Sequence, residues 1–538
     1  MFVQQLEPVA DSLGLSALVA TLPLITVLVL LGVVRMKAHL AGLIGLAVAA
    51  LVAWLAYGMP LGQTFAGAAQ GAVFGLFPIL WIVINALWVY RMTVRTRHFD
   101  ILRRSFGRLS DDPRIQALVV AFCFGALLEA LAGFGAPVAI CSVMLVALGF
   151  EPVRAAVVAL VANTAPVAFG AMGTPVVTLA EVTGLPLDTV ASVVGRQTPL
   201  LALVVPLVLV GLVDGRRGLR ETWVPALVCG VAFAVAQFAA SNYVSAQLAD
   251  IGAALAGAGA LVALPGARKP AEEPVRAAVL AGVRSEELDE DDPRPEVLRA
   301  YAPYALIVAV FSVAQIPAVK EVLAQATRTF DWPFLNVAGP DGEAVGQNVF
   351  SLPLLSTGGT LVLLAGLGTA AVLRVHARVA LREWAATVYE LRFAILTVTS
   401  VLALAYVMNL SGQAATIGHF VAAAGAGLAF LSPVLGWFGV AVSGSDTSAN
   451  ALFGALQVTA AQQSGLSPEL LAAANSSGGV LGKMISPQNL TIACAAVGLA
   501  GKEGDLLRKV LPWSIGLLLV MCLIVVGQST AVLGWMLP

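Results

Sequence analysis

The stretch A-N-T-A-P-V-A-F-G-A-M-G-T-P at residues 162–175 returns in a related form, A-N-S-S-G-G-V-L-G-K-M-I-S-P, at residues 474–487. Aligned without a gap, the two copies have Ala, Asn, Gly, Met and Pro in the same places. Both copies are polar and interrupted by Gly or Pro, and the Asn of each follows an isolated acidic residue, Glu129 or Asp446, by 34 or 29 residues. A duplicated, broken polar element among apolar segments predicts the binding site of a membrane transporter.

The composition places this motif in a membrane protein. Hydrophobic residues make up 59% of the chain and charged residues 11%, whereas a soluble domain has roughly 25% charged residues. A net charge of −1 without a basic patch argues against a nucleic-acid partner. The five cysteines and four histidines are scattered without the spacing of metal ligands, so we expect neither a metal site nor a cofactor. The predicted fold class is an all-α polytopic membrane protein.

Apolar runs of about 20 residues, the length of a membrane-spanning helix, divide the chain into two similar halves. In each half we expect five spans and one re-entrant hairpin, because an acidic residue and a broken tip leave each hairpin arm too short to cross alone. The predicted parts are a first repeat at 1–222 with its hairpin near 115–149, connecting spans at 223–265, a cytoplasmic linker at 266–299, and a second repeat at 300–538 with its hairpin near 428–464.

Basic residues at the ends of the apolar runs orient the chain. Arginine-rich loops belong in the cytoplasm by the positive-inside rule, so both termini are expected outside. An odd number of spans inverts the second half, and the two hairpins then enter from opposite faces, as in elevator-type ion transporters. That likeness is an analogy of fold alone. Hydropathy alone could instead count the hairpin arms as full helices, giving about 14 spans rather than 12 spans plus two hairpins.

Two half-helices meeting at each Asn motif would leave backbone N–H groups unpaired near the middle of the membrane. Helix N-termini and small hydroxyl groups bind carboxylates, so we expect a substrate anion there, close to the hairpin tips. Helix packing through small residues is the alternative explanation of the motifs. The predicted substrate-binding residues are Asn163, Thr164, Asn475, Ser476, Ser477, Lys483, Gly133, Gly135 and Ser445.

Glu129, Asp446 and Lys483 are the charged residues placed deepest in apolar sequence. Ionisable residues inside a membrane are costly and usually functional. Because burial disfavours the charged form of a carboxylate, Glu129 and Asp446 are the predicted proton-coupling residues. Glu129 is the first choice, since no cationic residue is close to it in sequence. Lys483 would bind a substrate anion or pair with an acidic residue, for which Asp446 is the expected partner.

These residues resemble the L-lactate permease family of bacterial secondary transporters. The matching stretches are E-A-L-A-G-F-G-A-P-V-A-I (129–140), A-N-T-A-P-V-A-F-G-A-M-G (162–173), S-G-S-D-T-S-A-N-A-L-F (443–453) and A-N-S-S-G-G-V-L-G-K-M-I-S-P-Q (474–488). The resemblance implies import of L-lactate, D-lactate and glycolate with protons across the bacterial inner membrane. The expected partners are therefore a small monocarboxylate, protons and membrane lipid, and a homodimer is left open.

Three other functions are compatible with parts of the sequence. A sodium-coupled di- or tricarboxylate transporter could use the same Asn, Ser and Thr residues, and uptake under separate ion gradients would distinguish it. An intramembrane enzyme would need a nucleophile and a base at one depth, and no Ser/His or Cys/His pair stands out. A passive channel is also possible, but hairpins that enter from both faces suit a transporter with alternating access better.

Overall fold

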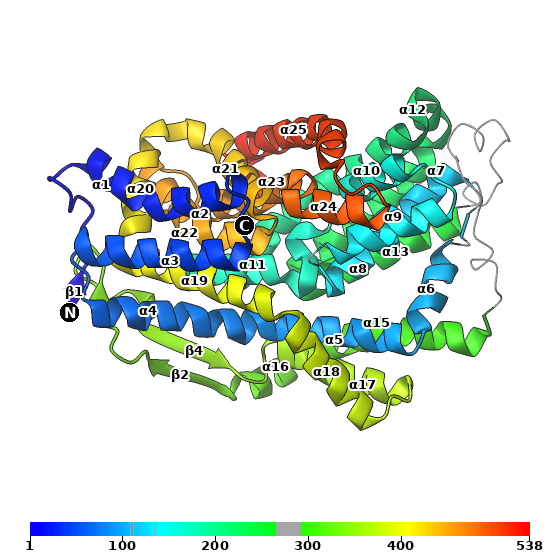
Figure 1. Ribbon diagram of the computed structural model, residues 1–538, viewed down its shortest axis with the longest axis horizontal. Coiled ribbons are helices and arrows are strands. Elements are labelled where there is room, and N and C mark those ends of the chain that lie inside the picture. The colour runs from blue at the N-terminus through cyan, green and yellow to red at the C-terminus, as the bar shows by residue number, and fades with distance from the viewer. Residues whose placement is uncertain (108, 111, 134, 265–291) are drawn as a thin grey trace.

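The computed structural model describes residues 1–538 except 108, 111, 134 and 265–291. The described chain is mostly helical, and most of its long helices run along the long axis of the molecule (Figure 1). The first three helices, α1 (Leu13–Ala20), α2 (Leu22–Gly32) and α3 (Ala38–Leu55), turn large apolar side chains outward. Among these, Leu18, Ile25 and Leu51 are 47–62% exposed. An exposed apolar surface of this kind is expected where helices face lipid.

The first half ends with two helices, α12 (Leu187–Tyr243) and α13 (Ala249–Ala263), that lie against the first hairpin. Its helices are α1 (Leu13–Ala20), α2 (Leu22–Gly32), α3 (Ala38–Leu55), α4 (Leu61–Phe74), α5 (Trp81–Arg95), α6 (His98–Gly107), α7 (Pro113–Gln116), α8 (Gly125–Leu131), α9 (Ala136–Ala147), α10 (Pro152–Ala162), α11 (Gly170–Thr183), α12 (Leu187–Tyr243) and α13 (Ala249–Ala263). The backbone of α12 leaves the helical conformation at Asp214 and Gly215, which bends it between two predicted spans.

The second half, like the first, consists mainly of helices. Its helices are α15 (Arg294–Ala314), α16 (Pro317–Ala324), α17 (Gly358–Val372), α18 (Ala377–Glu390), α19 (Arg392–Ser411), α20 (Gln413–Val421), α21 (Leu428–Ser443), α22 (Asp446–Ser464), α23 (Pro468–Gly482), α24 (Pro487–Ala496) and α25 (Glu503–Gln528). Helix α15 begins inside the predicted linker, 266–299, most of which lies outside the described residues.

The fold is not purely helical, and the all-α prediction was wrong on this point. A short parallel pair joins β1 (Phe2–Val3) to β3 (Val337–Ala338), and an antiparallel pair joins β2 (Thr327–Asp331) to β4 (Val349–Pro353). The loop between α16 and α17 contains T-R-T-F-D and V-F-S-L-P, and their β-branched and aromatic residues favour strands. These strands lie along the edge of the molecule beside α4 (Figure 1).

A helix, a tip and a second helix are present at both predicted hairpins. In the first, α7 continues through a π-helical stretch into α8, so one arm is an unbroken helix of 19 residues, Pro113–Leu131. This arm is longer than predicted, because Glu129 is paired inside the protein and does not interrupt the helix. In the second, α21 and α22 meet at Gly444 and Ser445.

The two Asn motifs differ in where the helix breaks. Helices α10 and α11 are separated after Asn163 and bent by 66°. Helix α23 instead continues through Asn475 to Gly482, so the predicted break at Asn475 was wrong. The first copy has a proline three residues after its Asn, whereas the second has none before Pro487. Proline cannot continue a helix, and therefore the second break falls just before Pro487.

In the described part of the chain, ten helices are long and apolar enough to cross a membrane, or eleven with the bent pair α10–α11 counted as one span. The repeat boundaries and the count of 12 spans plus two hairpins stay predictions.

Candidate functional site

Glu129 on α8 is the first carboxylate of the site, and its side chain is buried. After α8 ends, Gly133 (φ 44°) and Gly135 (φ 86°) turn the chain into α9. Glycine adopts these left-handed conformations without strain. A Cβ atom on Gly135 would lie 2.5 Å from Ile492 of α24, so the tip of the first hairpin packs closely on the second half of the chain.

The first helix break presents a polar side chain to this carboxylate. Asn163 lies at the end of α10, and its Nδ2 donates to Oε2 of Glu129 at 3.0 Å. Thr164 turns back instead, and its Oγ1 donates to the carbonyl of Val161 at 2.7 Å. Asn163 therefore supports Glu129, and Thr164 caps the helix that ends beside it.

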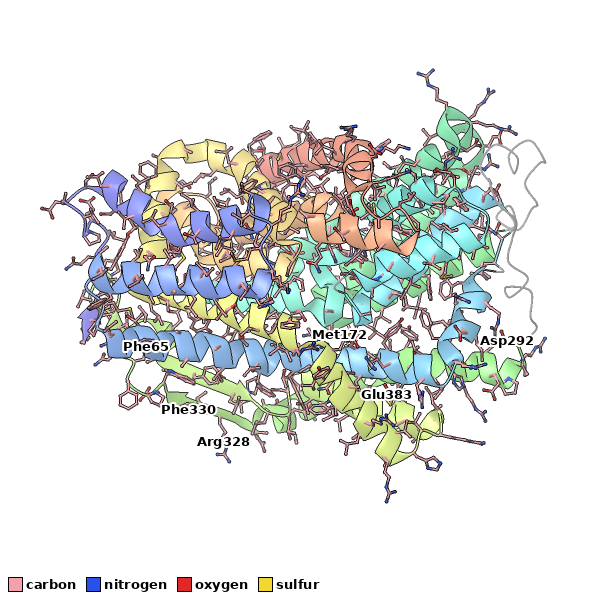
Figure 2. All side chains as sticks on the ribbon, viewed as in Figure 1. Phe65, Met172, Asp292, Arg328, Phe330 and Glu383 are labelled. Atoms are coloured by element: carbon pink, nitrogen blue, oxygen red, sulfur yellow. The ribbon has the colours of Figure 1, made fainter. Side chains whose placement is uncertain are left out.

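The backbone that follows the break is strained. Ala171 and Met172 have φ values of 45° and 58°, and Gly173 follows with 73°. For residues other than glycine this conformation costs roughly 1–2 kcal/mol each, and it persists where the surroundings hold it, often at functional sites. Met172 lies near the middle of the molecule in Figure 2. Gly170 is so close to Glu129 that a Cβ atom would lie 2.7 Å from Oε1.

Lys483 forms an ion pair with this same carboxylate. Its Nζ lies 2.5 Å from Oε1 of Glu129, although the two residues are 354 positions apart. Both side chains are buried. The sequence suggested that Glu129 had no cationic neighbour and that Lys483 would pair with Asp446. The structure places the lysine on Glu129, because the second break brings it to the first hairpin.

Asp446, the second carboxylate, is held by neutral groups. It is the first residue of α22, after Ser445, whose side chain caps the helix by accepting from the N–H of Ser448. Oδ2 of Asp446 accepts from Oγ of Ser476 at 2.6 Å and from Nδ2 of Asn450 at 3.4 Å. Oδ1 has no hydrogen-bond partner among the described residues.

Two further polar residues of α23, Asn475 and Ser477, form no hydrogen bond with this carboxylate in the described structure. Nδ2 of Asn475 donates to Oδ1 of Asn450 at 2.9 Å, and its Oδ1 accepts from Gln457 at 3.3 Å. Asn475 therefore contacts Asp446 only through Asn450. The buried Oγ of Ser477 has no partner in the described part of the chain.

A small cavity of about 60 Å³ lies where the two hairpin tips and the two breaks meet. Glu129, Asp446 and Lys483, the three charged residues deepest in apolar sequence, all line this one cavity. Its lining residues are Glu129, Gly133, Val167, Gly170, Ala171, Thr174, Pro175, Gly444, Ser445, Asp446, Thr447, Lys483 and Gln488.

The predicted site residues therefore form two groups. Glu129, Gly133, Ser445, Asp446 and Lys483 line the cavity. A second group lies outside the lining. Asn163 and Ser476 donate to the two carboxylates, Thr164, Asn475 and Gly135 contact neighbouring groups, and Ser477 has no partner among the described residues.

Three polar lining residues were missed. Thr174 and Gln488 lie beside Pro175 and Pro487, and Thr447 directly follows Asp446. Proximity to Pro175 and Pro487, which restart the helices, is the signal that could have identified Thr174 and Gln488. Among the described residues no group of three or more His, Cys, Asp or Glu side chains could hold a metal ion.

Comparisons with known proteins identify the family of the chain. The family model described as L-lactate permease matches residues 16–532. The chain is 42% identical to the L-lactate permease of Bacillus subtilis over 567 residues, covering 100% of both chains. It is 41% identical to the glycolate permease GlcA of Escherichia coli, covering 92% of both. The solved structure of MtrF from Neisseria gonorrhoeae has a similar fold, with a TM-score of 0.51, 12% identity and coverage of 94% of this chain and 97% of that one. This chain belongs to the L-lactate permease family.

Proposed function

We propose that this protein is a secondary active transporter that imports L-lactate, D-lactate and glycolate with protons across the bacterial inner membrane. Relatives named L-lactate permease and glycolate permease support the substrate class. The observation that carries the proposal is the cavity in which Lys483, Glu129 and Asp446 meet between two hairpin tips and two breaks. A single cation beside hydroxyl and amide groups suits a small monocarboxylate.

The surroundings of the cavity favour an anion. Lys483 supplies a positive charge at the lining. Helix α22 begins at Asp446 and α24 at Pro487, and both N-termini adjoin lining residues. A helix N-terminus carries a partial positive charge and free N–H groups, which attract carboxylates. We propose that the substrate carboxylate binds between Lys483 and these two helix ends.

Proton coupling follows from competition for one lysine. Lys483 neutralises Glu129 in the structure. When a substrate carboxylate takes the lysine, Glu129 is left buried without its cation. Burial then favours the uncharged form of Glu129, which binds a proton. Substrate and proton therefore bind together, with Glu129 as the coupling residue and Asp446 as the second candidate.

We further propose that the two halves are an inverted repeat that works by an elevator-type movement. Reciprocal contacts support the repeat: α9 of the first hairpin packs on α24, and α22 of the second hairpin packs on α11. Each hairpin thus contacts the broken helix of the other half, as a two-fold relation requires. Broken helices and paired hairpins at the site are typical of such transporters.

Uptake into proteoliposomes tests the substrate and the driving ion. Labelled lactate or glycolate should accumulate when a pH gradient is imposed, and unlabelled lactate should compete. Accumulation driven by a sodium gradient alone, or competition by di- and tricarboxylates only, would contradict the proposal. Uptake that never exceeds equilibrium under either gradient would indicate a passive channel.

Cysteine labelling tests the inverted repeat and the orientation. The native cysteines are buried, so a membrane-impermeant maleimide should label single cysteines introduced at exposed positions. Arg216→Cys reports on the α12 bend, where Arg114 at the base of the first hairpin pairs with Asp214. Gln463→Cys reports on the end of α22. We expect the first to label from the cytoplasm and the second from outside. Labelling of both from one side would refute the inversion.

A further inference from the structure

Asp250 on α13 is another buried carboxyl group, and the proposed coupling does not use it. Its side chain is 0% exposed. Oδ1 accepts from Nε2 of Gln237 at 3.0 Å, and Oδ2 has no partner in the described part of the chain. None of the ion pairs between described residues involves Asp250. Burying a carboxyl group with only one neutral partner costs free energy. The presence of Asp250 at this place therefore suggests that its contact has a role.

Gln237 connects this carboxyl to the first helix break. Besides its bond to Asp250, Nε2 donates to the carbonyl of Ala165 at 3.3 Å. On its other side, Oε1 accepts from Oγ1 of Thr198 at 3.4 Å. Because Nε2 has an acceptor in both Asp250 and Ala165, the amide has one favourable orientation. Asp250 therefore orients the Gln237 amide, which donates to the carbonyl of Ala165 in the break.

The carbonyl of Ala165 needs such a partner because it lies in the break. Ala165 is two residues after Asn163, which donates to Glu129, and it precedes Pro166. A carbonyl that has lost its helical partner inside apolar surroundings is destabilising unless another donor reaches it. Gln237 is that donor, so the position of Asn163 beside Glu129 depends on it.

The segment that carries Asp250 also contacts the other end of the same break. A Cβ atom on Gly173 would lie 3.3 Å from the carbonyl oxygen of Ala246, in the turn just before α13. Helix α13 packs on α8, which carries Glu129. Ala246 thus lies beside Gly173, and Asp250 reaches Ala165 through Gln237.

We propose that Asp250 is a positioning residue of the transport site, which acts through Gln237 to hold the first break and keep Asn163 on Glu129. This proposal rests on the cavity being the transport site. Asp250 does not contact the cavity lining in any hydrogen bond or ion pair of the described residues.

The test compares variants that keep or remove the hydrogen-bond acceptor. Asp250→Asn keeps an oxygen for Gln237, so KM for lactate uptake should stay within about twofold of the original. Asp250→Leu and Gln237→Leu each remove the link, and KM should rise roughly tenfold, as for a lost buried hydrogen bond. The double variant should be no worse than Gln237→Leu, because both residues act through the same link and Gln237→Leu has already removed it.

Gln197→Leu is the matched control. Gln197 is also a fully buried glutamine on α12, but its amide bonds Gln528, away from the break. It should lower thermal stability without raising KM. Hydrogen exchange of the peptide containing residues 161–170 gives a readout that needs no substrate, and exchange should be faster in Asp250→Leu and Gln237→Leu than in Gln197→Leu.

Two results would overturn the proposal. If Asp250→Asn fails as severely as Asp250→Leu while exchange at the break is unchanged, Asp250 acts through its charge. If Gln197→Leu shows the same rise in KM and in exchange, the effect is general loosening. Failure of the unaltered protein to take up lactate would instead refute the proposed function, and the exchange experiment would still test the link.

Discussion

The two buried carboxylates of the site are stabilised in different ways. Glu129 has a lysine at 2.5 Å and an asparagine at 3.0 Å. Asp446 has a hydroxyl group at 2.6 Å and an amide at 3.4 Å, with one oxygen unpartnered among the described residues. A substrate anion that takes the lysine leaves Glu129 without its cation, whereas a substrate that takes the Ser476 hydroxyl removes only a neutral partner from Asp446. The first carboxylate is therefore suited to coupling, and the second to holding a hairpin tip.

This asymmetry comes from one position of the duplicated motif. Lys483 stands where the first copy has Ala171. The lysine of the second copy forms an ion pair with the carboxylate of the first half. In the described structure no cationic side chain of the first half forms an ion pair with Asp446. The two copies therefore build one shared site rather than two equal ones.

Loss of the lysine should have the largest effect. Lys483→Met leaves Glu129 buried without its cation, and breaking a buried ion pair in this way costs about 3–5 kcal/mol. It also removes the proposed partner of the substrate. We expect lactate uptake to fall by roughly 100-fold, since a hydrogen bond to a charged group contributes about 1.5–3 kcal/mol. Uptake assays and thermal unfolding in detergent measure the two effects.

Lys502→Met, at an exposed lysine near the start of α25, is the control and should change neither quantity. The double variant Glu129→Gln with Lys483→Met should recover stability without recovering uptake. Full uptake in Lys483→Met would show that the substrate does not bind this cation.

The second largest effect should separate the two carboxylates. Glu129→Gln mimics the protonated side chain, so it should abolish accumulation driven by a pH gradient and spare lactate counterflow, which needs no net proton movement. Asp446→Asn should slow transport but keep pH-driven accumulation, because Asp446 forms no ion pair with Lys483 for a substrate to replace. The opposite pattern would assign the coupling proton to Asp446.

The sequence was sufficient for the motifs that carry the site but not for how they meet. Gly, Pro and buried charges interrupt the apolar runs in a recognisable way and predicted both tips. The repeated Asn motif predicted the two helix breaks, of which the second falls before Pro487 and not at Asn475. The pair between Glu129 and Lys483 joins residues 354 positions apart, and no local pattern encodes such a contact. Likewise, Asp250 and Gln237 look like isolated polar residues until the fold brings them to the break.

The third effect concerns the two asparagines, which are aligned in sequence but not equivalent in the structure. Asn163 contacts Glu129 directly, so Asn163→Ala should raise KM for lactate roughly tenfold. Asn475 bonds Asn450 and Gln457 instead, and Asn475→Ala should lower stability by about 1–3 kcal/mol with little change in KM. Equal rises in KM for both variants would show that the two copies contribute alike to substrate binding.

The smallest expected effect on transport comes from two aligned glycines, Gly170 and Gly482. A Cβ atom on Gly482 would lie 2.2 Å from the carbonyl oxygen of Trp437, where α23 and α21 pack backbone to backbone. The backbone cannot yield easily, so Gly482→Ala should cost about 1–3 kcal/mol of stability by overpacking. The close neighbour of Gly170 is the end of the Glu129 side chain, which can move.

Gly170→Ala should therefore cost less stability and change uptake a few-fold, because it displaces the carboxylate that Lys483 neutralises. Gly259→Ala on α13 is the control, since nothing lies within 4 Å of that position, and alanine there should be neutral or stabilising by roughly 0.5–1 kcal/mol. Thermal unfolding and initial uptake rates of the three variants distinguish the roles. If Gly170→Ala behaves like Gly482→Ala, losing stability in proportion to uptake, then the first copy is a packing element too, and the difference between the two copies lies only in the lysine.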